Sequence, residues 1–385
     1  MDTIYMDYNA TTPIRDEVFD MMLRVSRECF GNPSSAHLPG RMSKACLEDA
    51  RRKVAASLGA DASEIVFTHG GSESVNLAVK GIAAGRTSGH IITTCIEHAA
   101  VRKSCEYLES CGFEVSCLPV DGAGCADPEV IRGAIRDDTF LITVMWANNE
   151  AGQIQPVAEI AQIARDHKVV FHTDAVQAFG KIPVDVRKTP VDLLSVSGHK
   201  FYAPKGVGAL YIRNGIGLSP EVHGGGQEMG LRSGTENVAA AAALGEACRL
   251  AVRDLDEIAT RLSALRDTLE NGILERVPDT LVTGDPDRRV PNTTNISFRG
   301  IEASRLIQRL DESGIAVSGA SACASATADP SPVLMKGMGL SRKQAIGAAR
   351  FSLGRHSEES HVERVLEILP SIVADLRHGA SGGAA

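Results

Sequence analysis

Apolar and amphipathic segments alternate along the chain from about residue 60 onward. Short runs rich in apolar or β-branched residues predict strands over 64–68, 89–94, 139–145, 169–172, 193–196 and 208–212. Between them, residues 128–135 and 157–167 carry apolar side chains at helical spacing. Strands that alternate with helices indicate an α/β domain, in which the helices cover the faces of a mostly parallel sheet.

The pattern changes beyond residue 236, where a long helical stretch over about 236–277 leads out of this domain. The elements predicted after it are a strand over 294–298 and helices near 302–312, 341–349 and 357–378. This mixture indicates a smaller α+β domain.

These patterns also predict where the domains begin and end. We expect a large α/β domain over residues 15–257 and a small C-terminal domain over residues 258–376, with residues 1–14 packed against the small one. The chain ends in a run of Gly, Ala and Ser, so residues 377–385 are expected to form a disordered tail.

Composition narrows the class of partner. The chain has 385 residues, 43% of them hydrophobic, so it can bury a sizeable core and divide into about two domains. Its formal net charge is -8 and its Lys and Arg residues form no stripe, which argues against a nucleic-acid partner and favours a small molecule or a protein. No apolar run is long enough to predict a membrane helix, and residues 1–5 contain no basic or apolar leader, so we expect a cytoplasmic protein.

The cysteines suggest neither a disulfide framework nor a zinc knuckle. There are nine of them, an odd number, and no two are spaced as Cys-x-x-Cys. We therefore expect most of them to be reduced residues that pack in the interior.

Candidate chemistry lies directly after the predicted strands, because ligands of open α/β sheets bind outside the carboxyl ends of the strands. After the first strand, Gly71 and Ser72 form a glycine turn at the start of a helix, which suits a phosphate; an ordinary serine N-cap is the alternative. His98 follows the second strand, where its imidazole either lies on an aromatic ring or simply packs. Asn149 follows the third, in a polar cluster that is either a turn or a hydrogen-bonding site.

The fourth and fifth strands end in an acid and an amine. Asp174 either caps a turn or pairs with a protonated pyridine nitrogen, which keeps such a ring electron-withdrawing. Lys200 follows an apolar strand directly, so partial desolvation would make its amine a Schiff-base nucleophile. Most lysines are solvated surface charges instead, as we expect for Lys205.

Two further candidates lie in the predicted small domain. Cys323 stands among Ala, Ser and Gly residues over 318–327, which indicates a mobile loop presenting a nucleophilic thiol; a cysteine buried in a tight turn is the alternative. Arg350 can bind a carboxylate through two hydrogen bonds, although a surface salt bridge is the commoner use of an arginine.

Taken together and in order, these motifs resemble the cysteine desulfurases of the NifS/IscS type. Those enzymes are class V aminotransferases with the aspartate aminotransferase fold of pyridoxal-phosphate enzymes, a large α/β domain with a mostly parallel sheet plus a smaller α+β domain. The resemblance runs from about Tyr5 to Leu366. Its markers are DYNATT at 7–12, GNPSS at 31–35, NNE at 148–150, SGHK at 197–200, GGGQE at 224–228, RSGT at 232–235 and SAC at 321–323.

The resemblance implies pyridoxal 5'-phosphate as the cofactor, held by Lys200 as a Schiff base. It implies that Asp174 pairs with the pyridine nitrogen and that Gln177 contacts the ring hydroxyl. His98 would stack on the ring and shuttle protons.

The phosphate-binding residues implied by the resemblance come from two subunits. Gly71, Ser72, Ser197 and His199 would hold the phosphate within one subunit. Thr235 would join them from the second subunit of a homodimer.

The resemblance further implies how L-cysteine is handled. Asn149, beside the cofactor, and Arg350 would orient the substrate, with Arg350 taking its carboxylate. Cys323 would attack the substrate sulfur as a thiolate, leaving L-alanine and a persulfide that passes to an iron-sulfur scaffold or another sulfur acceptor. No resident metal is implied, although Cys323 could ligate an iron-sulfur cluster transiently with a partner.

This chain departs from the family pattern at a few positions. Ser72 stands where threonine is common, which keeps the hydroxyl. Met229 stands where an arginine is frequent, so a polar contact at the dimer or acceptor surface is missing. Ala320 and Ala324 replace the usual glycine and threonine beside the thiol, which affects loop flexibility and sulfur transfer.

Three rival functions remain open from the sequence. A selenocysteine lyase or an aminotransferase would share the fold, but an aminotransferase needs no thiol such as Cys323. A sulfur-relay scaffold without catalysis would need none of Lys200, Asp174 and His98.

Overall fold

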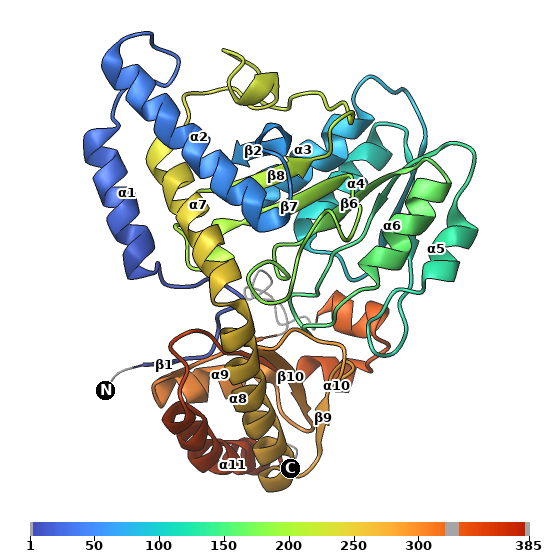
Figure 1. The fold of residues 1–385 in the computed structure, drawn as a ribbon. Coiled ribbons are helices and arrows are strands. Elements are labelled where there is room, and N and C mark those ends of the chain that lie inside the picture. Colours follow the sequence, from blue (N-terminus) through green and yellow to red (C-terminus); the bar gives the residue numbers. More distant parts are fainter. Residues whose placement is uncertain (1–2, 320–330, 382–385) are drawn as a thin grey trace.

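Two main sheets, each with its own apolar core, organise the chain (Figure 1). The computed structural model describes residues 3–319 and 331–381. In that part of the chain, no helix combines the length and the apolar content that crossing a bilayer requires.

The larger sheet has seven strands in the order β2-β8-β7-β6-β5-β3-β4. Its strands are β2 (Ile65–Thr68), β3 (His90–Thr94), β4 (Glu114–Leu118), β5 (Thr139–Thr143), β6 (Val170–Asp174), β7 (Leu193–Ser197) and β8 (Gly208–Ile212). Only β8 runs against its neighbours, β2 and β7, while the remaining pairs are parallel. The predicted α/β fold with a mostly parallel sheet is therefore confirmed, and six strands end at one common edge.

Helices cover both faces of this sheet, which is why its central strands are apolar on both sides. The helices of the large unit are α1 (Asp16–Glu28), α2 (Leu38–Leu58), α3 (Gly71–Ala83), α4 (Ala99–Ser110), α5 (Pro128–Ala134), α6 (Val157–Asp166) and α7 (Val238–Arg253). Alternate residues of β3 face different helices: Ile92 packs in the core formed with α2, α6 and α7, and Ile91 packs with α3 and α4. Helices α1, α2 and α7 lie together as one layer (Figure 1).

The smaller sheet has four strands in the order β12-β13-β10-β9, and all of its pairs are antiparallel. Its elements are β9 (Thr280–Val282), β10 (Thr293–Phe298), β12 (Ser318–Gly319) and β13 (Ala348–Ser352), with helices α8 (Leu255–Arg276), α9 (Ala303–Glu312), α10 (Arg342–Ile346) and α11 (Glu359–Ser381). Short helical turns η1 (Ala62–Glu64), η2 (Gly198–Lys200), η3 (Glu228–Gly230) and η5 (Val333–Gly337) complete the described elements of the two units.

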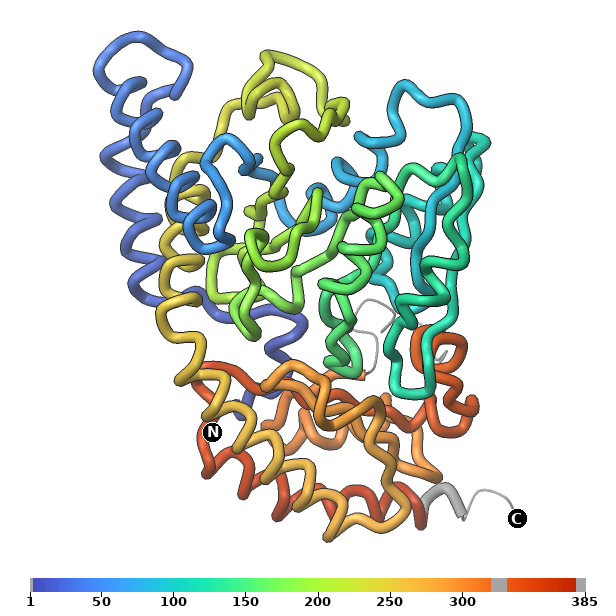
Figure 2. The backbone as a smooth tube through the Cα atoms, turned by 45° about the vertical axis from the view of Figure 1, so that its right-hand side comes forward, coloured from blue at the N-terminus to red at the C-terminus, as the bar shows by residue number. Residues whose placement is uncertain are grey.

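The N-terminal segment lies beside the C-terminal unit (Figure 2). Strand β1 (Ile4–Tyr5) pairs with β11 (Ile315–Ala316), and Met6 is fully buried in the core of the smaller unit. The division into residues 15–257 and 258–376 stays a prediction.

Three predicted elements are wrong in part. The stretch 236–277 is two helices, α7 and α8, because Asp254 leaves the helical conformation and accepts hydrogen bonds from Arg15 and Arg355 at 2.6 and 3.0 Å. The helix predicted over 341–349 ends at residue 346, since β13 pairs with β10 and β12 from residue 348 onward. Residues 377–381 are helical and not a disordered tail, and the Arg377 guanidinium bonds to the Arg299 carbonyl at 2.9 Å.

Candidate active site

A cavity of about 500 Å³ opens at the common carboxyl edge of the large sheet. Its walls come from both units, because Lys200 follows β7 of the large sheet and Arg350 lies on β13 of the small one. The N-terminal segment contributes Asn9 and Ala10.

Most of the predicted site residues meet in this cavity. Those that line it are Gly71, Ser72, His98, Asn149, Asp174, Gln177, Ser197, His199, Lys200 and Arg350. Thr235 is exposed and is not among the described residues that line it. Cys323 lies in the segment 320–330, outside the described residues.

The start of α3 forms one wall. Strand β8 passes so close that a Cβ on Gly208 would lie 2.8 Å from the Cα of Gly70, so glycine is needed at this crossing. Gly70 is the N-cap residue, and no side chain caps the helix. Uncapped N–H groups at a helix N-terminus favour an anion, and Ser72 adds a hydroxyl at the same place.

An acid and an imidazole, Asp174 and His98, line the same cavity. Asp174 is buried at the end of β6, and its Oδ1 accepts the Val176 N–H at 3.0 Å. Burial raises the pKa of Asp174, and the charges of His98 and Lys200 oppose that shift. The Nδ1 of His98 accepts the Ala100 N–H at 3.1 Å, so a neutral His98 carries its proton on Nε2.

The Lys200 amine is oriented by backbone carbonyls. Its Nζ donates to the carbonyl oxygens of Asn9 and Ala10, each at 2.7 Å. Gln177 donates to the same Asn9 oxygen at 2.9 Å. The N-terminal segment therefore positions both the lysine and the glutamine of the predicted cofactor site.

The sequence did not indicate a second amine beside Asn9 and Gln177, that of Lys181. Its Nζ donates to the Asn9 Oδ1 at 2.7 Å and also to the Gln177 Oε1. Burial, with the charges of Lys200 and Arg350, lowers the pKa of Lys181 well below its usual value. The only signal in the sequence is its position four residues after Gln177, among apolar neighbours.

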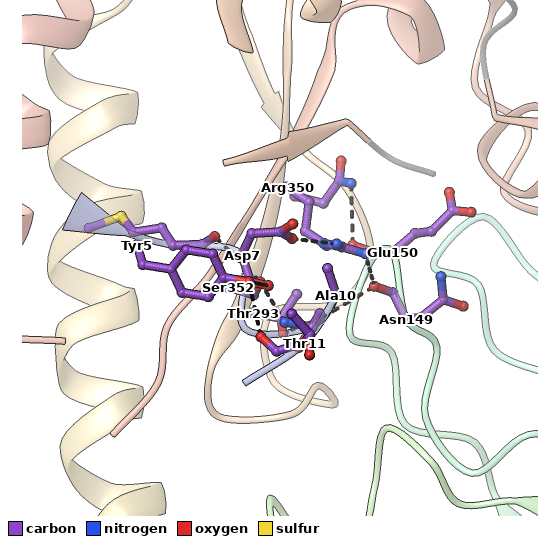
Figure 3. Close-up of polar contacts among 12 residues, drawn as sticks. Tyr5, Asp7, Ala10, Thr11, Asn149, Glu150, Thr293, Arg350 and Ser352 are labelled. Carbon is purple, nitrogen blue, oxygen red and sulfur yellow. Dashed lines mark hydrogen bonds and ion pairs between the residues drawn. The ribbon is translucent and has the colours of Figure 1, made fainter. Parts of the chain in front are cut away.

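Arg350 is held from two sides by hydrogen bonds to Asp7 and Asn149 (Figure 3). Its Nη2 donates to the Asp7 Oδ1 at 2.7 Å, and its Nη1 donates to the Asn149 carbonyl at 2.7 Å. The side chain is 2% exposed, and its Nε is buried without a hydrogen-bond partner in the described part of the chain. Arg350 lines the cavity, and a buried guanidinium N–H left unpaired by the described residues indicates that a ligand acceptor completes its hydrogen bonding.

Two buried carboxyl groups line the cavity and were given no role by the sequence. Burial raises the pKa of Glu97 to about 8 and that of Glu150 to about 7. The Glu97 Oε1 accepts from Thr94 and from the Met145 N–H at 2.7 and 2.9 Å, while its Oε2 has no partner within the described residues. Burial therefore favours the protonated form of both carboxyl groups in this cavity.

The described residues on either side of the segment that contains Cys323 contact residues that line the cavity. Before it, Ser318 pairs with Arg350 across β12 and β13. After it, the Ser331 hydroxyl donates to the Glu150 Oε2 at 2.5 Å, and Val333 lines the cavity.

Comparison with known proteins agrees with this geometry. The family model for class-V aminotransferases matches residues 4–365. Cysteine desulfurase IscS of Methanosarcina thermophila is 49% identical over 377 residues, 97% of this chain and 93% of that protein. A solved NifS-like protein has a TM-score of 0.91 at 40% identity, covering 97% of this chain and 100% of that chain. SspA in complex with cysteine has a TM-score of 0.82 at 39% identity, covering 91% and 99%. The chain therefore belongs to the class-V aminotransferase family, in its NifS/IscS group of cysteine desulfurases.

Proposed function

We propose that this chain is a pyridoxal-phosphate-dependent cysteine desulfurase that converts L-cysteine to L-alanine and stores the sulfur as a persulfide on Cys323. The observation that carries the proposal is that Arg350 lines the same cavity as Lys200 and Asp174 and that the described residues leave its buried Nε unpaired. That cavity offers an amine for the cofactor, a carboxylate for its ring nitrogen and a guanidinium for the substrate carboxylate.

The donor set fits the cofactor. The uncapped start of α3 and the hydroxyls of Ser72 and Ser197 suit a phosphate, with His199 beside them. Asp174 is buried where a cationic ring nitrogen would offset the cost of its charge. When bound, pyridoxal phosphate supplies an electron sink for the bond to the substrate α-carbon.

The protein side chains bind the substrate and transfer protons. Arg350 binds the substrate carboxylate, and Asp7 keeps the guanidinium in place. Asn149 is fixed on the same side, because its carbonyl accepts from Arg350. His98 exchanges protons through Nε2, since its Nδ1 is engaged with the Ala100 N–H.

Sulfur leaves the substrate by attack of a thiol. The Cys323 thiolate forms a bond to the substrate sulfur while the bond between that sulfur and the substrate β-carbon breaks, and the β-carbon regains a proton as alanine forms. The product on the protein is Cys–S–SH, so no external oxidant is needed. Support comes from the two flanks of the segment: Ser318 pairs with Arg350, and Ser331 donates a hydrogen bond to Glu150. Arg350 and Glu150 both line the cavity.

A homodimer and a sulfur acceptor complete the proposal. Thr235 is exposed and does not line the cavity of its own subunit, as expected for a residue given to a partner copy. Phe30 and Met229 are 77% and 55% exposed, which leaves apolar surface for a second copy or an acceptor protein. The acceptor we propose is an iron-sulfur scaffold or another thiolation protein.

The test separates the thiol from the cofactor. The Cys323→Ala variant should keep the visible absorbance of the bound cofactor and lose both alanine formation and the transfer of labelled sulfur from cysteine to the protein. Cys111→Ala, at an exposed cysteine, is the matched control and should behave as the wild type. Lys200→Ala should lose the borohydride-reducible attachment of the cofactor. Alanine and sulfide formed at the wild-type rate by Cys323→Ala would show that a different group takes the sulfur.

A further inference from the structure

Two cysteines outside the active site lie within reach of a covalent bond. Cys29 is the C-cap residue directly after helix α1, Cys46 lies in helix α2, and their Sγ atoms are 2.7 Å apart. A disulfide bond is about 2.05 Å long, so these sulfurs need only a small movement to join. The sequence alone offers no reason to pair these two cysteines, which are separated by 16 residues and show no disulfide spacing.

The positions of both sulfurs are fixed by the packing of three helices. Cys29 and Cys46 pack against Val25 of α1 and Val238 and Ala242 of α7. The backbone carbonyl of Cys29 also accepts the hydroxyl of Ser43, on α2, at 2.8 Å. The packing of α1, α2 and α7 therefore brings the two thiols close together.

A reagent can reach this pair from the surface. Both cysteines are partly exposed, and Cys46 lines a surface cavity of about 280 Å³. Arg24 and Lys53 line the same cavity, together with Asp49, which pairs with Lys53 at 3.1 Å. Arg24 leaves the cavity wall cationic beside Cys46, which suits an anionic reagent such as a glutathione-type disulfide.

We propose that Cys29 and Cys46 form a redox-active dithiol that closes to an intramolecular disulfide when a low-molecular-weight disulfide oxidises it. One protein thiolate attacks the reagent, forming a mixed disulfide and releasing one reagent thiol. The second protein thiolate then attacks the protein-bound sulfur and releases the other reagent thiol. The two protein thiols lose two electrons and two protons, and the reagent is reduced to two thiols.

The modification should act on the stability of the α1 and α2 layer. A bond between residues 29 and 46 closes the loop that contains Phe30 and Gly31, which restricts the unfolded chain. Burial and the adjacent Cys29 thiol raise the pKa of Cys46 to about 11. Because only the thiolate attacks a disulfide, the reagent is used in excess. Among the described residues, none that lines this cavity also lines the active-site cavity, so turnover of cysteine should not depend on the pair.

Peptide mapping of the cofactor-loaded enzyme tests the proposal directly. The protein is incubated with excess glutathione disulfide, its remaining thiols are alkylated, and it is digested with trypsin without reductant. Cys29 and Cys46 fall in different tryptic peptides, residues 28–41 and 45–51. We expect these two peptides as one cross-linked species that separates on reduction, and a higher melting temperature than in the reduced enzyme.

Two variants test whether the cross-link forms specifically between Cys29 and Cys46 or results from general oxidation of thiols. Cys29→Ser should abolish the cross-link and the rise in melting temperature while keeping desulfurase activity, and Cys111→Ser should abolish neither. The proposal is overturned if the two peptides stay separately alkylated or carry only glutathione, or if Cys46 is found linked to another cysteine. Because the readout is the peptide pair, it is independent of whether Cys323 carries the sulfur.

Discussion

Replacing Arg350 by lysine tests whether this residue reads the substrate carboxylate. Lysine keeps the positive charge next to Asp7 but loses the planar guanidinium, whose Nε has no hydrogen-bond partner among the described residues. The Asp7 carboxylate, 19% exposed, keeps a cationic partner, so the Arg350→Lys variant should fold.

The expected loss follows from one hydrogen bond. A hydrogen bond to a charged group contributes about 1.5–3 kcal/mol, and each 1.4 kcal/mol is a factor of about ten. Without the Nε donor, kcat/KM for L-cysteine should therefore fall about 10- to 150-fold, measured by alanine formation. Thermal denaturation with cofactor bound checks that the variant is folded.

Cysteamine, which is cysteine without its carboxylate, makes the assay specific. The wild type should bind L-cysteine more tightly than cysteamine by a similar factor, measured by spectral titration of the bound cofactor. In Arg350→Lys this preference should nearly disappear. If the variant keeps the full preference for cysteine over cysteamine, Arg350 does not bind the carboxylate and the reasoning fails.

Three further predictions concern buried polar groups. Lys181→Met removes the amine that donates a hydrogen bond to the Gln177 Oε1. Cofactor binding, measured by fluorescence titration, should weaken about tenfold, which corresponds to the loss of one hydrogen bond. Unchanged affinity would exclude a positioning role for Lys181. The Glu228 carboxylate is 2% exposed and pairs with the Arg51 guanidinium at 2.7 Å, so Arg51→Met leaves a buried charge without its partner. The free energy of unfolding measured in urea should fall by about 3–5 kcal/mol. A loss below about 1 kcal/mol would contradict this. The pKa of Glu97 rises from 4.5 to about 8 on folding, so the folded chain binds a proton that the unfolded chain releases, and stability should decrease as the pH rises through that range. Glu97→Gln resembles the protonated form and should flatten the decrease in urea unfolding measured across pH; an unaltered profile would refute the assignment.

Apolar patterning was sufficient to predict six of the seven strands of the large sheet and the edge at which the candidate site residues lie. Asp174 and Lys200 were found because they follow apolar runs, and the carboxyl ends of parallel strands meet at one edge. Local pattern is enough for this, since burial on both faces requires an apolar strand whatever its neighbours are. Edge strand β4, half exposed, carries a weaker pattern and was missed.

Which distant side chains act together depends on how the elements pack, and the sequence does not show it. Arg350 is oriented by Asp7, 343 positions away, and Lys181 reaches Asn9 across 172 positions. Strand β13 was partly predicted as helix because its residues 348 and 349 become strand only by pairing with β10 and β12. Such contacts depend on how whole elements pack, and the periodicity of one segment contains no information about its partner. The sequence therefore located the ends of the strands, while the fold decided which groups hold the amine, the guanidinium and the two neighbouring thiols in place.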